Sequence, residues 1–282
     1  MTSSAPVRDA SALSRAFARP KIMGVINLTP DSFHEGSRAA SVEAAVAAGL
    51  RMAEEGADLI DLGGQSTRPG SDAVAVETEL ERVVPVVAAL AKKVKVPLSV
   101  DTDKSAVAAA AFDAGATVLN DVCALRGPGM LKAALRFERV VLMHMLGDSP
   151  KTMQKEPRYG DCVGEVSAFL RARLDAFLQA GGRRERVLVD PGVGFGKTLA
   201  HNLELIRGVP ELAKIAPVLL GVSRKSMFAK ISPDAGPQDR LAGSLAVVAW
   251  ASLSGAAMLR VHDVAETKRA LDVLEALAGG GA

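Results

Sequence analysis

The sequence has 282 residues, of which 49% are hydrophobic and only 4% aromatic, so we expect one large core of aliphatic side chains. Lys and Arg number 34 against 32 Asp and Glu, and the resulting net charge of +2 argues against nucleic acid or an anionic membrane as a partner. The two cysteines, Cys123 and Cys162, offer neither a disulfide framework nor metal-ligand spacing and are typical of a cytoplasmic protein.

Residues 1–20 precede the first apolar run. They are rich in Arg, Ser and Ala and lack the apolar segment of a secretory signal. We therefore predict a loosely ordered N-terminal extension here, followed by one catalytic domain over residues 21–278.

Eight short apolar runs follow, and each ends in polar or charged residues. A continuous Val, Ile and Leu run is typical of a strand that is buried on both faces in a parallel sheet. The predicted strands are 22–26, 59–62, 98–100, 118–119, 140–143, 187–189, 218–222 and 258–259.

Helical patterns separate these strands. They cover residues 41–55, 77–93, 104–113, 129–137, 161–180, 202–214, 238–254 and 265–278. Gly56 and Gly115 lie where a helix C-cap needs positive φ. A doubly wound sheet would need a Gly-rich turn after its first strand, and residues 27–31 contain no Gly. The alternation predicts an α/β fold, a (β/α)8 TIM barrel in a single domain.

Residues 241–259 form a nineteen-residue stretch without a charge. Its Gly and Ser residues, and its place directly before the last strand, favour a buried barrel helix over a membrane span.

Four polar residues follow strands three, four, six and seven. Asp101, Asn120, Asp190 and Lys225 would meet at the C-terminal rim of a barrel, where active sites lie. Two carboxylates, an amide and an ammonium suit a flat heterocycle with N–H groups and a carbonyl. Any one Asp could equally be a helix cap or part of an interior ion pair, so the prediction depends on the set.

Cations gather at another part of the same rim. Arg68, Arg260 and His262, with Asn27 nearby, would form an anion site that suits a phosphate. A magnesium ion could join through phosphate oxygens and one or two protein ligands.

Two long loops, 28–38 and 63–76, exceed an ordinary βα connection and are typical of an active-site lid. A third segment, 190–198, looks like a Walker motif but has Pro191 where that motif needs Gly. We keep it only as a flexible wall that carries Phe195.

His144 and Met145 end strand five. A core position is the favoured interpretation for His144. Met145 suits packing on an aromatic ligand face, although gap-filling is equally compatible with its flexible thioether.

Eight segments, in order along the chain, resemble the dihydropteroate synthase family. They are 24–33 (GVINLTPDSF), 66–70 (STRPG), 99–102 (SVDT), 120–121 (ND), 142–145 (LMHM), 190–197 (DPGVGFGK), 223–226 (SRKS) and 260–264 (RVHDV).

The resemblance implies condensation of 6-hydroxymethyl-7,8-dihydropterin diphosphate with 4-aminobenzoate, with Mg²⁺ as cofactor and a homodimer as the assembly. The pterin methylene would lose pyrophosphate to leave a stabilised cation, and an aniline nitrogen needs no strong base to attack it.

The resemblance also implies a role for each matching residue. Asp101, Asn120, Asp190 and Lys225 would hold the pterin edge, with Met145, Gly221 and Arg260 around the ring. Asn27, Arg260 and His262 would hold the diphosphate, Asn27 as the metal ligand. Thr67, Arg68, Pro69, Phe195, Lys225 and Ser226 would line the aminobenzoate site, and Asp31 with Phe33 would arrive on the first loop. The residues assigned to catalysis are Asp31, Arg68, Lys225, Arg260 and His262.

One position departs from the family pattern, because Gln65 stands where members usually carry Glu before Ser-Thr-Arg-Pro-Gly. Two alternatives stay open: a catalytically silent pterin-binding paralogue, and a pterin barrel that transfers a methyl group from methyltetrahydrofolate.

Overall fold

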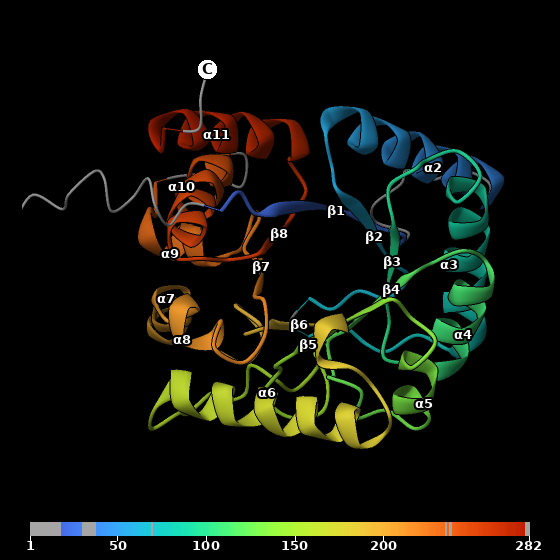
Figure 1. Ribbon diagram of the computed structural model, residues 1–282, viewed down its shortest axis with the longest axis horizontal. Coiled ribbons are helices and arrows are strands. Elements are labelled where there is room, and N and C mark those ends of the chain that lie inside the picture. The colour runs from blue at the N-terminus through green and yellow to red at the C-terminus, as the bar shows by residue number, and fades with distance from the viewer. Residues whose placement is uncertain (1–17, 30–37, 69, 235, 237–238, 280–282) are drawn as a thin grey trace, which may run out of the picture.

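Eight parallel strands surround a common axis in the computed structural model, and helices enclose them (Figure 1). The structure describes residues 18–29, 38–68, 70–234, 236 and 239–279. The strands are β1 (Lys21–Asn27), β2 (Leu59–Gly63), β3 (Leu98–Asp101), β4 (Val118–Asp121), β5 (Arg139–Met143), β6 (Val187–Asp190), β7 (Leu219–Gly221) and β8 (Met258–Val261). The predicted (β/α)8 barrel in one domain is confirmed.

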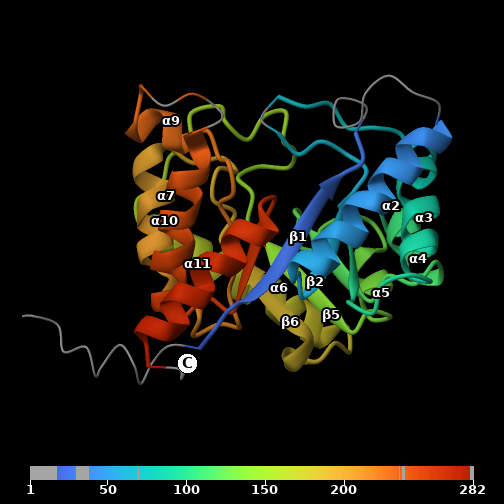
Figure 2. The same cartoon turned by 90° about the horizontal axis from the view of Figure 1, so that it is seen from above.

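Hydrogen-bonded neighbours follow the order β6-β5-β4-β3-β2-β1-β8-β7. A parallel bridge between Val189 and Val218, with the Val189 amide donating to Pro217 at 3.0 Å, joins β6 to β7 and closes the ring. The C-terminal ends of all eight strands therefore meet at one rim, where the connecting loops collect (Figure 2).

The surrounding helices match the predicted periodicity with a few differences. They are α2 (Arg38–Glu55), α3 (Val76–Leu90), α4 (Ser105–Asp113), α5 (Met130–Ala134), α6 (Cys162–Gln179), α7 (Leu199–Arg207), α8 (Val209–Leu212), α9 (Met227–Ile231), α10 (Arg240–Leu253) and α11 (Val264–Leu277). Gly56 and Gly115 have φ of 101° and 115°, as their C-cap positions require.

The prediction of one helix over 202–214 was wrong. The chain forms α7 and α8 with Gly208 between them, and α8 restarts with Pro210 in its first turn, where a missing N–H costs little. The short α9 was not predicted, and its five residues are too few for a periodic pattern to reveal.

The uncharged stretch forms α10 and then β8. Val248 and Ala251 of α10 are buried, whereas Trp250 is 51% and Leu253 45% exposed. The expected burial therefore applies to one face of the helix only. Among the described residues, none of the helices has the length and apolar character needed to cross a bilayer.

The described chain begins close to the last helix. Arg19 makes ion pairs with Asp272 and Glu275 of α11, at 2.8 and 2.7 Å. Residues 1–17 of the predicted extension lie outside the described residues.

An apolar ring fills the lower interior of the barrel. One side chain from each of seven strands contributes to it: Met23, Leu59, Val118, Val141, Leu188, Leu219 and Met258. Because successive strand residues alternate between two faces, the residue two positions further along each strand also points inward, one layer closer to the rim.

Candidate active site

The layer above the apolar ring is mostly polar. Counting two positions from the ring members gives Val25, Asp61, Asn120, Met143, Asp190, Gly221 and Arg260. The strand register places Asp101 beside Asn120, and Asp190 beside Met143. The geometry of the barrel thus brings three carboxylates, an amide and a guanidinium into one layer below the rim.

Arg260 holds two of these carboxylates at once. Its Nε donates to Asp61 at 2.7 Å and its Nη2 donates to Asp101 at 2.9 Å. Asp61 is fully buried and its Oδ1 has no hydrogen-bond partner among the described residues. Burial raises the pKa of Asp101, the charge of Arg260 opposes this rise, and the charge of Asp61 adds to it. The layer is therefore a charged network rather than a set of separate side chains.

Asn120 is oriented by the same network. Its Nδ2 donates to Asp61 Oδ2 at 3.1 Å. An ionised carboxylate can only accept hydrogen bonds, so the amide nitrogen must face Asp61. The Asn120 carbonyl oxygen then remains as the acceptor for a ligand N–H group.

Asp190 closes the polar layer on the other side. The Gly192 amide donates to its Oδ1 at 2.7 Å. Burial raises the pKa of Asp190, and the Gly192 hydrogen bond and the charge of Lys225 oppose this rise. Beside Asp190, a Cβ built on Gly221 would lie 3.8 Å from both Asp190 Oδ2 and Arg260 Cβ. The missing side chain thus leaves space next to the two charged groups.

Lys225 connects this layer to the wall after β6. Its Nζ donates to the Val193 carbonyl at 2.7 Å and lies 4.5 Å from the ring centroid of Phe195. Burial lowers the pKa of Lys225 to about 8, although the charge of Asp190 raises it. One ammonium is thus shared between the polar layer and the aromatic wall, with Ser226 exposed beside it.

His262 and Asn27 lie higher on the rim. The His262 Nδ1 lies 3.1 Å from Ser223 Oγ, which also accepts the His262 amide at 3.1 Å. Desolvation and the charges of Arg260 and Arg224 lower the pKa of His262, so its ring is neutral at pH 7. Asn27 ends β1 opposite Gly63. No group of three or more His, Cys, Asp or Glu side chains in the described part of the chain could hold a metal ion.

The second loop carries Thr67 and the exposed Arg68. Ser71 Oγ donates to the Ser66 and Arg68 carbonyls, each at 2.7 Å, and thereby folds this segment into a compact turn. Thr67 lines a small depression together with Gln65, Glu79, Asp101, Thr102, Asp103 and Val122. The structure thus brings Thr67 of the second loop close to Asp101 of the polar layer. Asp31, Phe33 and Pro69 lie outside the described residues.

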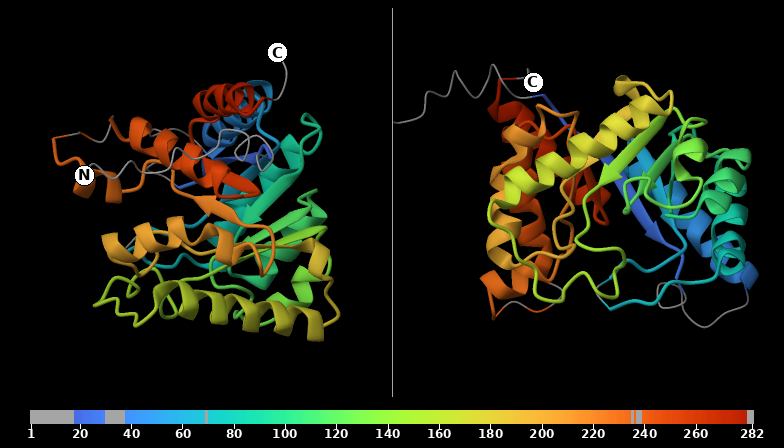
Figure 3. Two further views of the ribbon diagram at one scale, coloured as in Figure 1. Left: turned by 60° about the vertical axis from the view of Figure 1, so that its left-hand side comes forward. Right: turned by 90° about the horizontal axis from the view of Figure 1, so that it is seen from below.

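The connection between β5 and α6 runs at the rim, next to the loops that follow β2 and β6 (Figure 3). The Pro150 carbonyl accepts the Gly70 amide at 3.1 Å, and Gln154 Nε2 donates to the Gly194 carbonyl at 2.7 Å. The sequence pattern gave no sign of this connection's role. It joins the loop that carries Arg68 to the loop that carries Phe195.

Met145 and His144 have different surroundings. Met145 belongs to a sulfur-rich apolar cluster with Val122, Cys123, Met143 and Met153, against which Phe195 packs. His144 Nδ1 lies 3.0 Å from the buried Lys197 Nζ, and its ring packs edge-on against Phe169. These contacts give His144 a packing role inside the protein.

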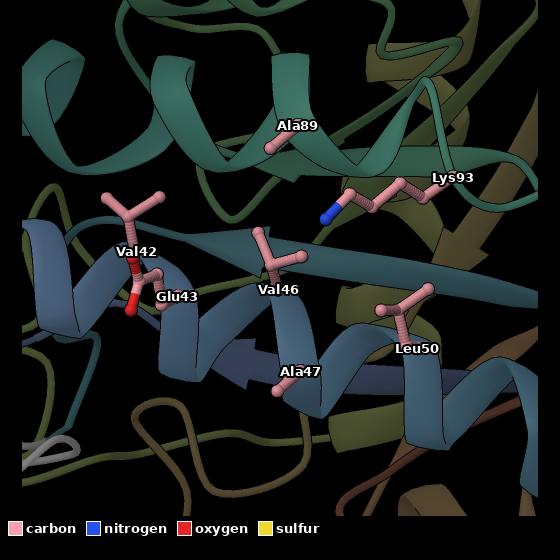
Figure 4. Close-up of a pocket in the computed structure, with 7 residues that line it drawn as sticks. All are labelled: Val42, Glu43, Val46, Ala47, Leu50, Ala89 and Lys93. Carbon is pink, nitrogen blue, oxygen red and sulfur yellow. The ribbon is translucent and has the colours of Figure 1, made fainter.

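A separate groove lies on the outer wall, between α2 and α3. It is lined by Val42, Glu43, Val46, Ala47, Leu50, Ala89 and Lys93 (Figure 4). None of the polar residues described above contributes to it, so it is not part of this site.

The sequence analysis did not single out Asp61, nor the ion pair between Glu79 and Lys104, whose Nζ and Oε2 lie 2.6 Å apart. Asp61 interrupts the apolar run of β2, and an acid in a doubly buried strand is itself a signal. Glu79 on α3 and Lys104 before α4 gave no such signal, because charged residues are ordinary in exposed parts of helices.

Comparisons with known proteins identify the family of this chain. The family model described as pterin binding enzyme matches residues 23–262. The dihydropteroate synthase of Escherichia coli K12 is 44% identical over 269 residues, which cover 95% of each chain. A structure of Xanthomonas albilineans dihydropteroate synthase with 4-aminobenzoic acid has a TM-score of 0.86 at 50% identity and covers 92% of this chain and 93% of the other. A structure of the same enzyme with 7,8-dihydropteroate has a TM-score of 0.82 at 47% identity and covers 92% and 94% of the two chains. The chain belongs to the dihydropteroate synthase family of pterin-binding enzymes.

Proposed function

We propose that this protein condenses 6-hydroxymethyl-7,8-dihydropterin diphosphate with 4-aminobenzoate to give 7,8-dihydropteroate and pyrophosphate. The observation that carries the proposal is the polar site of Asp101, Asn120, Asp190 and Lys225. Arg260 and Asp61 hold Asp101 and Asn120, the Gly192 amide holds Asp190, and the Val193 carbonyl holds Lys225. Related enzymes have been solved with 4-aminobenzoic acid and with 7,8-dihydropteroate, which supports both substrates.

The pterin would lie in the space that Gly221 leaves open, with Met145 and Arg260 against its faces. Asp190 and Asp101 would accept from the amino and ring N–H groups, and the Asn120 carbonyl from a further N–H. Lys225 would donate to the ring carbonyl. These four side chains would then each have a partner on the ligand, which favours a ligand of this hydrogen-bonding pattern over one without it.

The diphosphate would bind at Asn27, His262 and the outer edge of Arg260. Mg²⁺ usually binds through one or two protein oxygens together with phosphate oxygens and water. Asn27 offers one such oxygen and no acidic cluster stands nearby among the described residues, so the donor set fits an ion shared with the substrate. When bound, the ion would neutralise charge that develops on the leaving pyrophosphate.

4-Aminobenzoate would lie between the second loop and the Phe195 wall. Arg68 and Ser226 would offer donors for its carboxylate, and Thr67 and the Phe195 ring would flank the aromatic face. Lys225 contacts Phe195 and the polar layer, so it would lie between the two substrates.

The chemistry follows from this division of the site. The bond between the methylene carbon and the diphosphate oxygen breaks, and pyrophosphate leaves with both electrons. The aniline nitrogen then forms the new C–N bond and releases a proton to solvent. Asp31, arriving on the first loop, would stabilise the positive methylene carbon, and exclusion of water would prevent its capture. No strong base is required for these steps.

We further propose a cytoplasmic homodimer. Both cysteines are free and buried, which fits a reducing compartment. Three exposed apolar residues, Ile231, Trp250 and Leu253, lie on α9 and α10, and these two helices contact each other. Exposed apolar side chains on these neighbouring helices favour α10 over α6, whose exposed positions include Glu165, Arg171 and Asp175.

A direct assay tests the activity. Purified protein is mixed with Mg²⁺, the pterin diphosphate and labelled 4-aminobenzoate, and pteroate and pyrophosphate are measured. Turnover that needs all three additions is the expected result. Pterin binding without turnover at millimolar substrate would instead identify a silent paralogue.

A further inference from the structure

The partly buried lysine Lys104 connects elements that do not themselves belong to the polar layer. Lys104 Nζ donates to Glu79 Oε2 on α3 at 2.6 Å. It also donates to Gln65 Oε1, at the root of the second loop, at 2.7 Å. A third and longer contact of 3.3 Å reaches Asp103. Desolvation opposes the charged form, but these acidic partners prevail and raise the pKa of Lys104. The ammonium therefore remains positive at this position.

Gln65 closes the second loop with a single atom. Its Oε1 accepts from Lys104 Nζ and also from the Val74 amide at 3.1 Å. The two ends of the segment 65–74 are thus fixed to one another and to the helix layer. Moving Gln65 away from α4 would break its bond to Lys104, and moving Val74 away from Gln65 would break the other.

The contact between Gln65 and Lys104, called the anchor below, is supported by the buried carboxylate of Glu79. Glu79 is fully buried, and Oε1 of its carboxylate has no hydrogen-bond partner among the described residues. Within the described part of the chain, Lys104 is the ion-pair partner of Glu79, so loss of the lysine would leave a buried carboxylate unpaired. The Lys104 amide also donates to Thr102 Oγ1 at 3.2 Å, next to Asp101 of the polar layer. The anchor and the polar layer therefore share one segment of backbone.

Arg68 depends on this support. It is exposed, and no side-chain contact of its guanidinium is found within the described part of the chain. Its position is set by the backbone of the loop, through the bonds of Ser71 and the closure at Gln65. A change in the backbone of this loop would therefore move Arg68 and Thr67.

We propose that Gln65 and Lys104 are positioning residues that set the affinity for the aromatic amine substrate by holding Arg68 and Thr67 in place. The inference rests on the proposed function. It also gives a physical reason for an acceptor oxygen at position 65. The Gln amide supplies that oxygen, and a Glu carboxylate would supply it as well.

Three variants test this role by kinetics. Gln65→Leu removes the acceptor at similar volume, Gln65→Glu keeps it, and Gln179→Leu makes the same change at an exposed position that ends α6. In Gln65→Leu we expect KM for 4-aminobenzoate to rise roughly tenfold or more, with KM for the pterin diphosphate within about twofold of the unsubstituted value. Gln65→Glu should keep KM for 4-aminobenzoate near the unsubstituted value, and Gln179→Leu should change neither KM. An unchanged KM for 4-aminobenzoate in Gln65→Leu, or an equal rise in both, would overturn the proposal.

Hydrogen exchange tests the anchor without turnover, so it also decides the matter if the protein makes no pteroate. The Val74 amide should exchange faster in Gln65→Leu than in the unsubstituted protein, Gln65→Glu or Gln179→Leu. Exchange at Val74 that is the same in all four proteins would show that no anchor exists, whatever the assay of the proposed reaction gives.

Discussion

Arg260 of β8 and Asp61 of β2 lie 199 residues apart in the sequence and 2.7 Å apart between Nε and Oδ2. The same Asp61 oxygen accepts the Asn120 amide. A residue that no ligand needs to contact therefore fixes the orientation of two residues that would contact the pterin.

Asp61→Asn tests this dependence. An amide oxygen at this position can still accept hydrogen bonds, but the neutral amide loses the negative charge that attracts and orients the Arg260 guanidinium. We expect pterin affinity to fall roughly tenfold, which corresponds to about 1.4 kcal/mol. Titration calorimetry with a pterin measures the change. Unaltered pterin affinity in a variant that still folds would contradict the proposed orientation.

Asp190→Asn and Arg68→Ala separate the two halves of the site. Asp190 belongs to the polar layer, so its variant should lose pterin binding. Arg68 lies on the second loop, so its variant should keep pterin binding and mainly lose turnover. Pterin binding and steady-state rates are measured on both proteins, and normal turnover in both variants would refute these roles.

The strands and the polar strand ends could be predicted because both follow from local rules. A doubly buried strand reads as an apolar run, and the residue that ends it must lie at the rim. The contacts of Arg260 could not be predicted in this way. The sequence suggests a cation free for an anion, whereas the structure pairs Arg260 with Asp61 and Asp101.

Two further contacts could not be predicted because they join segments that are far apart in the sequence. Gln65 and Lys104 are 39 residues apart, and only the folded barrel brings the root of one loop to the start of α4. The bond between Gly70 and Pro150 likewise depends on how two rim loops meet. Neither relationship has a periodic or compositional signal.

We expect the pH profile of kcat/KM to have a basic limb that reflects loss of the Lys225 proton. Burial lowers the pKa of its ammonium to about 8, so the folded protein loses this proton well below the ordinary pKa of 10.5. Its contact with the pterin carbonyl and with Phe195 should weaken as pH rises through 8, and kcat/KM should fall. The same shift means that the folded state binds fewer protons than the unfolded state between pH 8 and 10.5. The contribution of Lys225 to stability therefore rises with pH across that window.

Lys225→Arg is the matched variant for this limb. A guanidinium stays charged at every accessible pH, so the Lys225 part of the decline should disappear even where the overall rate is lower. The pH dependence of kcat/KM from pH 6 to 10 measures the outcome for both proteins. An identical basic limb in the two proteins would assign it to another group.

The exposed Trp250 provides a test of the proposed dimer interface. It is 51% exposed on α10, close in sequence to the exposed Leu253, and a charge placed there should prevent apolar contact between two copies. We expect the unsubstituted protein to have the mass of a dimer by light scattering and Trp250→Asp that of a monomer. Val273→Asp is the matched control, because Val273 is 60% exposed on α11 and its variant should remain dimeric. A monomeric unsubstituted protein would contradict the proposed dimer, and a Trp250→Asp variant that remains dimeric would move the interface away from α10.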